Sequence, residues 1–218
     1  MKVFLLTLLI VGTSSSPDLN IARDFVKPIQ NAKVQDSGPS YEELHDEAMF
    51  NCPHATVSSE NQKIIAMLVE IEKAYNPPPK MRGMLLAAAC MESGFNPFAK
   101  GDHKFSKSKK KAMAIGILQQ WPFYEKHYGT VRTDPKSAAT SWMDHIVKQL
   151  PKVKKMCSRR SKSKLWLAAW VTGIRSKKVG GRCNEVPLHY RLLKRWHKNI
   201  SKDRKVRMDC ASQDTCGC

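Results

Sequence analysis

Glu92 is the residue of this chain whose setting best suits acid–base chemistry. It lies in the run Ala-Ala-Cys-Met-Glu-Ser-Gly-Phe-Asn-Pro (residues 88–97), behind the apolar stretch 84–89 and ahead of Gly94 and Pro97, which end helices. A carboxyl group at the C-terminal end of an apolar helix is held where its negative charge is disfavoured. The helix dipole repels the charge, and apolar neighbours displace its water. Such a carboxyl group is a candidate general acid.

Further blocks follow Glu92 in a recognisable order. They are Gly-Ile-Leu-Gln (116–119), a Trp-rich stretch over 165–173 and Tyr190. The chain resembles the soluble lytic transglycosylase family of the lysozyme-like superfamily over roughly residues 60–200. That family carries a Glu-Ser-Gly-Phe-Asn-Pro block, a Gly-Leu-Met-Gln block, an Ala-Tyr-Asn-x-Gly block and a late tyrosine. The first block is the specific part of the resemblance.

The resemblance implies a role for each matched residue. Glu92 is expected to be the catalytic acid and base, and Ser93 to orient the substrate or the glutamate. Gln119 is expected to hydrogen-bond in the sugar cleft, and the Tyr190 hydroxyl to reach the glutamate region. Trp170, which stands where the family has a tyrosine, could stack on a sugar face. Each has a structural alternative: Ser93 could bond a backbone carbonyl, Gln119 could be an ordinary helix residue, and a Trp in a helix commonly belongs to the core.

The reaction depends on a second carboxylate. Hydrolases of glycosidic bonds usually have one, whereas lytic transglycosylases usually work with a single glutamate and give a 1,6-anhydro product. Asp102 lies between the first two blocks, in a position similar to a Gly-Asp of goose-type lysozymes. The pair Trp170-Val171 replaces the family's Tyr-Asn, whose asparagine touches the N-acetyl group. These features leave open a hydrolytic lysozyme and a modified or deacetylated glycan.

Four segments are expected along the chain of 218 residues. Residues 1–16 read as a signal peptide, with Lys2 ahead of a short apolar run and serines behind it. Residues 17–58 form an N-terminal extension, residues 59–200 the lysozyme-like domain, and residues 201–218 a Cys-rich tail. The protein is therefore expected to be secreted or periplasmic.

Helical periodicity predicts a mainly α domain, and the resemblance implies a lysozyme-like fold with a substrate cleft. Helices are expected over 80–93 and 112–120, and from Asp134, Ser163 and Pro187 onward. In the last of these, Leu188, Leu192, Trp196 and Ile200 are expected to face inward. No segment shows the alternation typical of a strand.

Seven cysteines suit an oxidising compartment. Cys157 and Cys183 flank the Trp-rich helix and could staple it, whereas Cys90 is expected to be a small buried core residue. The tail spacing Cys-x5-Cys-x-Cys matches no familiar zinc pattern, so neither metal nor cofactor is expected.

The formal net charge of +18 favours polyanions as partners. Six lysines in the loop 100–111 are expected to dock the protein on anionic cell-wall polymers beside the glycan strands, and no specific nucleic acid is expected. We expect a monomer. The function predicted is cleavage of the β-1,4 bond between MurNAc and GlcNAc in peptidoglycan. A non-catalytic wall- or polyanion-binding protein on the same scaffold is the alternative from another class.

Overall fold

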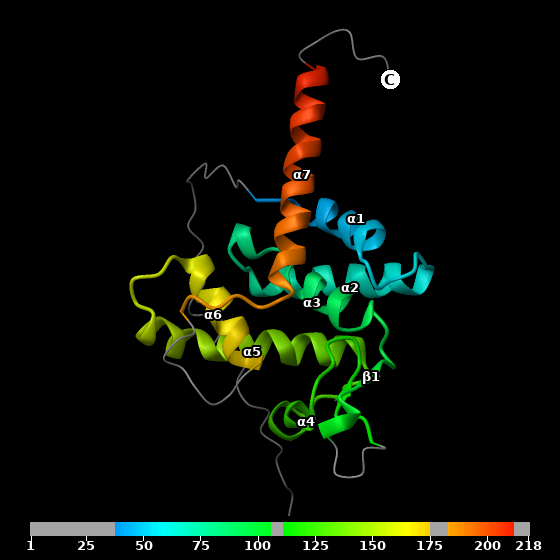
Figure 1. Ribbon diagram of the computed structural model, residues 1–218, viewed down its shortest axis with the longest axis vertical. Helices are drawn as coiled ribbons and strands as arrows, with labels where there is room; N and C mark the ends of the chain where they lie inside the picture. Colours follow the sequence, from blue (N-terminus) through cyan, green and yellow to red (C-terminus); the bar gives the residue numbers. More distant parts are fainter. Residues whose placement is uncertain (1–37, 106–110, 175–182, 212–218) are drawn as a thin grey trace, which may run out of the picture. The chain divides into compact units, whose positions relative to one another are not determined.

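The computed structural model describes residues 38–105, 111–174 and 183–211. They belong to a unit that runs from Asp36 to Cys218. The expected signal peptide and the first half of the expected extension, residues 17–37, lie outside the described residues. Within them the fold is mainly helical, as predicted (Figure 1), with the helices α1 (Tyr41–Asn51), α2 (Ser59–Tyr75), α3 (Met84–Ser93), α4 (Pro122–Tyr128), α5 (Pro135–Met156), α6 (Lys162–Ile174) and α7 (Tyr190–Ala211).

Helix α1 corrects the expected domain boundary at residue 59. Ser40 caps it through a capping box with Glu43, and Leu44 is fully buried. The helix packs against α2, α3 and α7. Arg204 of α7 bonds the Glu43 carboxylate and holds its pKa at about 2. The helical unit thus begins with α1, because α1 supplies a face of its core.

Helix α3 is the centre of this core. Every side chain from Met84 to Cys90 is buried, which explains why the sequence shows no polar face there. The expected helix over 80–93 is divided, because Gly83 has φ 84° and separates α3 from the 3₁₀ turn η2 (Pro79–Met81). At the other end Gly94 closes α3 in the left-handed conformation, as expected.

The predicted helix over 112–120 is absent from the structure. The segment instead carries strand β2 (Ala114–Ile115), which pairs antiparallel with β1 (Lys100–Gly101), followed by turns. Gly116 has φ 85°, and a Cβ there would lie 1.9 Å from the Arg132 carbonyl oxygen. This backbone contact, together with the pairing of the two strands, prevents a helix that the apolar spacing had suggested.

The helices that follow match the sequence in part. Asp134 caps α5 by accepting from Ser137 N, and Pro135 takes the first helical position, as predicted. Helix α6 begins at Lys162, so Ser163 lies inside it and is not its cap. Helix α7 begins at Tyr190, and Leu188 is exposed in the turn before it.

Two disulfides cross-link the described residues. Cys157 and Cys183 pair around α6, as the sequence had suggested. Cys90 is buried in the core, as expected, and is joined there to Cys52, a pairing that the sequence did not suggest. The predicted Cys-rich tail over residues 201–218 is corrected as well, because α7 extends to Ala211 and includes much of that segment. Cys216 and Cys218 lie outside the described residues. Among the described helices, none combines the length and apolar character needed to cross a membrane.

Candidate functional site

Glu92 lies in the last turn of α3, where its carboxylate meets the imidazole of the residue just before α7. Its Oε1 is 2.9 Å from His189 Nε2. The Glu92 side chain is 33% exposed and that of His189 is 14% exposed. Glu92 therefore leaves the apolar core at the point where the chain turns, with one oxygen in contact with a partner and part of the side chain open to solvent. This is less burial than the apolar run ahead of it suggests.

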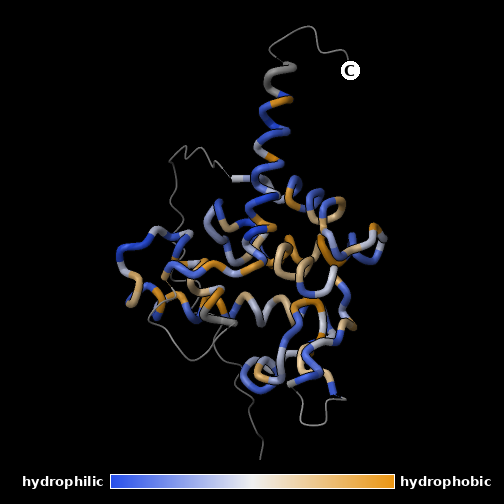
Figure 2. Tube along the Cα trace, viewed as in Figure 1, coloured by the Kyte–Doolittle hydropathy of each residue, from blue (hydrophilic) through white to orange (hydrophobic). Residues whose placement is uncertain are grey.

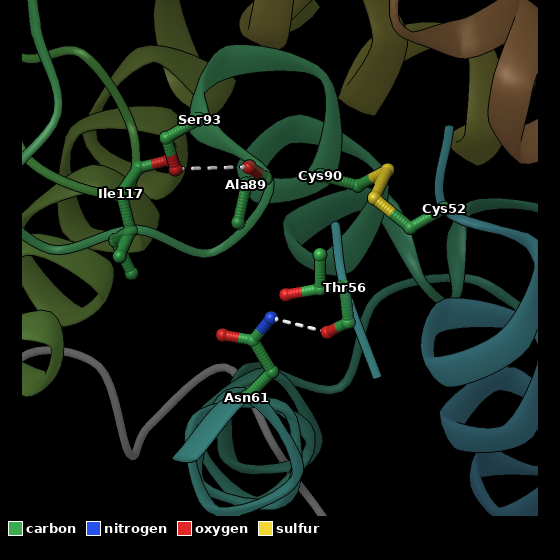
Figure 3. The surroundings of a disulfide bond; sticks show 7 residues. All are labelled: Cys52, Thr56, Asn61, Ala89, Cys90, Ser93 and Ile117. Atoms are coloured by element: carbon green, nitrogen blue, oxygen red, sulfur yellow. Dashed lines mark hydrogen bonds between the residues drawn. A yellow bond between two sulfur atoms is a disulfide. The ribbon is translucent and has the colours of Figure 1, made fainter. Parts of the chain in front are cut away.

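The backbone around Glu92 is fixed by its neighbours. A Cβ at Gly94 would lie 1.9 Å from the His54 carbonyl oxygen, so the end of α3 presses against the α1–α2 connection. The Cys52–Cys90 disulfide fastens α3 to the end of α1 two residues before Glu92 (Figure 3). Asn61 at the start of α2 donates to the Thr56 carbonyl in that connection. Glu92 thus sits on a rigid support, as a catalytic group requires.

Ser93 takes the structural alternative weighed from the sequence. Its hydroxyl contacts two backbone carbonyl oxygens, that of Ile117 at 2.9 Å and that of Ala89 at 3.3 Å (Figure 3). A hydroxyl has one proton to donate, so the shorter contact, with the Ile117 carbonyl, is the main hydrogen bond. Ser93 therefore ties the end of α3 to the loop that carries Gln119, and brings together two of the predicted blocks.

Gln119 has its amide nitrogen engaged with the backbone. Nε2 donates to the Ala99 carbonyl at 3.1 Å and to the Gly116 carbonyl at 3.0 Å. The residue has φ 44°, a strained conformation that these bonds hold. A Cβ at Gly101 would lie only 2.4 Å from the Gln119 Oε1. Gln119 thus orders the loop behind Glu92, and its amide protons are not free for a sugar.

Asp102 is joined to an aromatic residue that the sequence argument did not use. Its Oδ2 accepts from the indole Nε1 of Trp121 at 2.9 Å. Asp102 has φ 55°, and its side chain is partly exposed. Trp121 is 39% exposed. The pair forms a partly open surface of carboxylate and indole beside the β1–β2 hairpin.

Trp170 is 1% exposed, and its indole has neighbours from two elements. Trp142 of α5 meets it edge-on, with ring centroids 5.7 Å apart, and His189 lies nearly parallel to it at 6.1 Å. The predicted role of stacking on a sugar is therefore corrected, because the ring is enclosed in the core. Trp170 instead supports the histidine that contacts Glu92.

Tyr190 opens α7 and is partly buried against the core. The residue just before it, His189, supplies the contact with Glu92. Sequence reasoning missed His189 because it belongs to none of the matched blocks, and the Pro187 turn that precedes it carries no sign of where the ring points. It also missed Gln120, which is 2% exposed and bonds the Ala138 carbonyl of α5 at 2.9 Å.

Two surface cavities lie away from Glu92. One of about 350 Å³ is lined by residues of α4 and α5, including Tyr128, Asp134 and Asp144. The other, of about 410 Å³, is lined by residues of α1 and α2, including Tyr41, His45 and Glu70. Neither contains Glu92 or His189, although the second includes the His45–Asp46 pair, whose Nδ1 and Oδ1 atoms are 3.3 Å apart. Within the described part of the chain, no three His, Cys, Asp or Glu side chains are grouped to hold a metal ion.

Comparisons of the chain with protein-family models, with curated proteins and with solved structures found no match. The site must therefore be judged on its own geometry. It consists of an acid on a rigid helix end, an imidazole against that acid, a loop tied to the same helix by Ser93, and a carboxylate–indole pair on the neighbouring hairpin.

Proposed function

We propose that this protein cleaves the β-1,4 bond between MurNAc and GlcNAc in peptidoglycan, with Glu92 as general acid and base, in the manner of a lytic transglycosylase. The observation that carries the proposal is the placement of Glu92. A carboxyl group within a Glu-Ser-Gly-Phe-Asn-Pro block stands at the end of the central helix, one-third exposed, with its support cross-linked by a disulfide. The resemblance to lysozyme-like enzymes stays part of this proposal.

The reaction requires one group that first gives and then takes a proton. Protonated Glu92 gives its proton to the glycosidic oxygen, the bond from that oxygen to C1 of MurNAc breaks, and its electron pair stays on the leaving oxygen. The C6 hydroxyl oxygen of the same MurNAc then bonds C1, and the Glu92 carboxylate takes the hydroxyl proton. Such acid–base assistance contributes roughly 10²–10⁴-fold to rate. No second carboxylate is needed for this sequence of steps.

Hydrolysis is the second candidate, and Asp102 is the observation that favours it. Its carboxylate is partly exposed and oriented by Trp121, on the hairpin that follows the Glu92 block. A second carboxylate of this kind can activate water or stabilise an oxocarbenium-like centre. Replacing Asp102 with Asn keeps the bond from Trp121 and removes the charge. A hydrolase would then lose most of its activity, whereas a transglycosylase would keep it.

A basic surface supports docking on an anionic wall polymer. The chain from 145 to 184 contains no Asp or Glu. The described part of it, where α5 meets α6, exposes the cations Lys148, Lys152, Lys154, Lys155, Arg159, Arg160, Lys162 and Lys164. Among the described residues none of these eight forms an ion pair, and the connection is hydrophilic in Figure 2. This α5–α6 corner is a stronger candidate for docking than loop 100–111, of which 106–110 lie outside the described residues.

The docking proposal is tested by binding to purified wall sacculi across a salt series. Alanine at Lys152, Lys155, Arg159 and Arg160 should weaken binding and flatten its salt dependence. The matched control removes four exposed lysines from α7, namely Lys194, Lys198, Lys202 and Lys205. Equal losses in both variants would show that net charge, not the α5–α6 corner, drives the binding.

The cleavage proposal is tested with acetylated and deacetylated sacculi. Wild type should release soluble fragments, and Glu92→Gln should bind the sacculi without releasing any. Mass spectrometry of the fragments then separates 1,6-anhydro products from reducing ends. If wild type binds walls but releases nothing from either substrate, the chain is a binding protein and the enzymatic proposal is wrong.

A further inference from the structure

His189 contacts the proposed catalytic acid although it belongs to none of the blocks that point to the reaction. We propose that His189 is a positioning residue which donates its Nε2 proton to Oε1 of Glu92 and so leaves Oε2 as the oxygen that carries the catalytic proton. This inference rests on the proposed function of Glu92. It adds a residue and an orientation that the sequence did not suggest.

The imidazole is held in place by contacts on two sides. Nε2 lies 2.9 Å from Glu92 Oε1, a hydrogen-bond distance. The ring plane is within 15° of the Trp170 indole plane, at a centroid separation of 6.1 Å. Trp170 is itself fixed edge-on against Trp142 of α5. The position of His189 is therefore set by α6 and α5, not by its own turn alone.

The surroundings of the second ring nitrogen, Nδ1, indicate which nitrogen carries the proton. Nδ1 is buried and has no hydrogen-bond partner among the described residues. A proton on Nδ1 would place an N–H group there without an acceptor, and a doubly protonated ring would also bury charge. The neutral ring with its proton on Nε2 avoids both costs. In this form Nε2–H donates and Glu92 Oε1 accepts.

The consequence is an assignment of roles to the two oxygens of Glu92. Oε1 accepts from His189, so a proton on the carboxyl group resides on Oε2. That proton passes to the glycosidic oxygen as the bond to C1 breaks, and Oε2 later receives the proton from the C6 hydroxyl. His189 keeps its own proton throughout. Its contribution is orientation, which is worth most in the transition state.

Two variants separate the contribution of the aromatic ring from that of its Nε2 donor. His189→Phe keeps a flat ring against Trp170 and removes the donor, whereas His189→Gln loses the ring but places an amide N–H near the position of Nε2. We expect His189→Phe to lower kcat by about 10- to 100-fold with KM changed by less than about twofold, and His189→Gln to recover most of the loss. Thermal unfolding of each variant checks that the fold is intact.

Nitrogen-15 NMR tests the hydrogen bond without relying on cleavage. The His189 signals are assigned by their loss in His189→Gln. The wild-type spectrum at neutral pH should show a proton on Nε2 and none on Nδ1, and Glu92→Gln should shift the Nε2 signal. A proton on Nδ1 would overturn the inference, as would a His189→Phe variant that cleaves at the wild-type rate. The proposed function fails separately, if wild type does not cleave sacculi at all.

Discussion

Two glutamates stand at the opposite ends of α3 and are used in opposite ways. Glu72 of α2 lies at the N-terminal end, fully buried, where Oε1 accepts from Gly83 N at 2.5 Å and Oε2 from Leu85 N at 2.8 Å. Glu92 lies at the C-terminal end, one-third exposed, with one oxygen against His189. Both carboxyl groups lie at an end of the same apolar helix, and only their surroundings differ.

The difference shows how position decides the role of a carboxyl group. The first N–H groups of a helix lack partners within the helix, and Glu72 supplies an acceptor for them. Burial raises its pKa to about 7 in spite of these bonds. The end where Glu92 lies offers no backbone N–H groups, so its carboxylate faces a side chain and solvent. Glu72 thus anchors α3, and Glu92 remains available to a ligand.

Glu92 should matter most for activity. Glu92→Gln should lower the rate of glycan cleavage by about 10²–10⁴-fold, because the amide cannot transfer the proton. The free energy of unfolding should change by less than about 1 kcal/mol, since the side chain is partly exposed. Release of fragments from sacculi and urea denaturation measure the two effects. A large loss of stability would show that both ends of α3 are structural.

Glu72 should show the reverse pattern. Glu72→Ala should lower the free energy of unfolding by about 2–5 kcal/mol, because it leaves the N–H groups of Gly83 and Leu85 buried without an acceptor. The cleavage rate of the folded fraction should stay near wild type. Glu70→Ala is the control on the same helix, where the exposed pair with Lys73 contributes less than about 1 kcal/mol. Equal effects at the two positions would contradict the anchoring role.

The two disulfides test whether the cross-link beside Glu92 affects activity as well as stability. Replacing Cys52 and Cys90 with Ala, or Cys157 and Cys183 with Ala, should cost about 2–4 kcal/mol of unfolding free energy in either case, because they close loops of similar length, with sequence separations of 38 and 26. Cleavage should slow more in the first variant, whose disulfide holds α3 beside Glu92. Denaturation and kinetics on both variants decide this. If neither changes the rate, the disulfides act on stability alone.

The last prediction is a pH dependence of stability that Glu72 imposes. Its pKa is about 7 in the folded protein against an ordinary value of 4.5, so the folded state binds the proton more tightly than the unfolded chain does. The resulting stabilisation is complete below about pH 4.5 and is lost as pH rises through about 7. Urea denaturation across this range should therefore show wild type losing stability relative to Glu72→Gln. Parallel curves for the two proteins would contradict this role of Glu72.

Local sequence signals predicted part of this structure correctly. The helix start at Asp134-Pro135 and the helix end at Gly94 were predicted because each depends on the backbone of a few adjacent residues. The segment 112–120 was predicted wrongly for the complementary reason. Its apolar spacing suits a helix, but the approach of the Arg132 carbonyl to Gly116 and the pairing with β1 are long-range contacts.

Composition and short-range spacing were enough to predict the mainly helical class, the apolar α3 helix and the acid at its C-terminal end. The partners of that acid depend on long-range packing. This packing paired Cys90 with Cys52, enclosed Trp170 in the core and brought His189 against Glu92. Such contacts join residues far apart in the chain, and they form only when the core packs. No local pattern therefore records them.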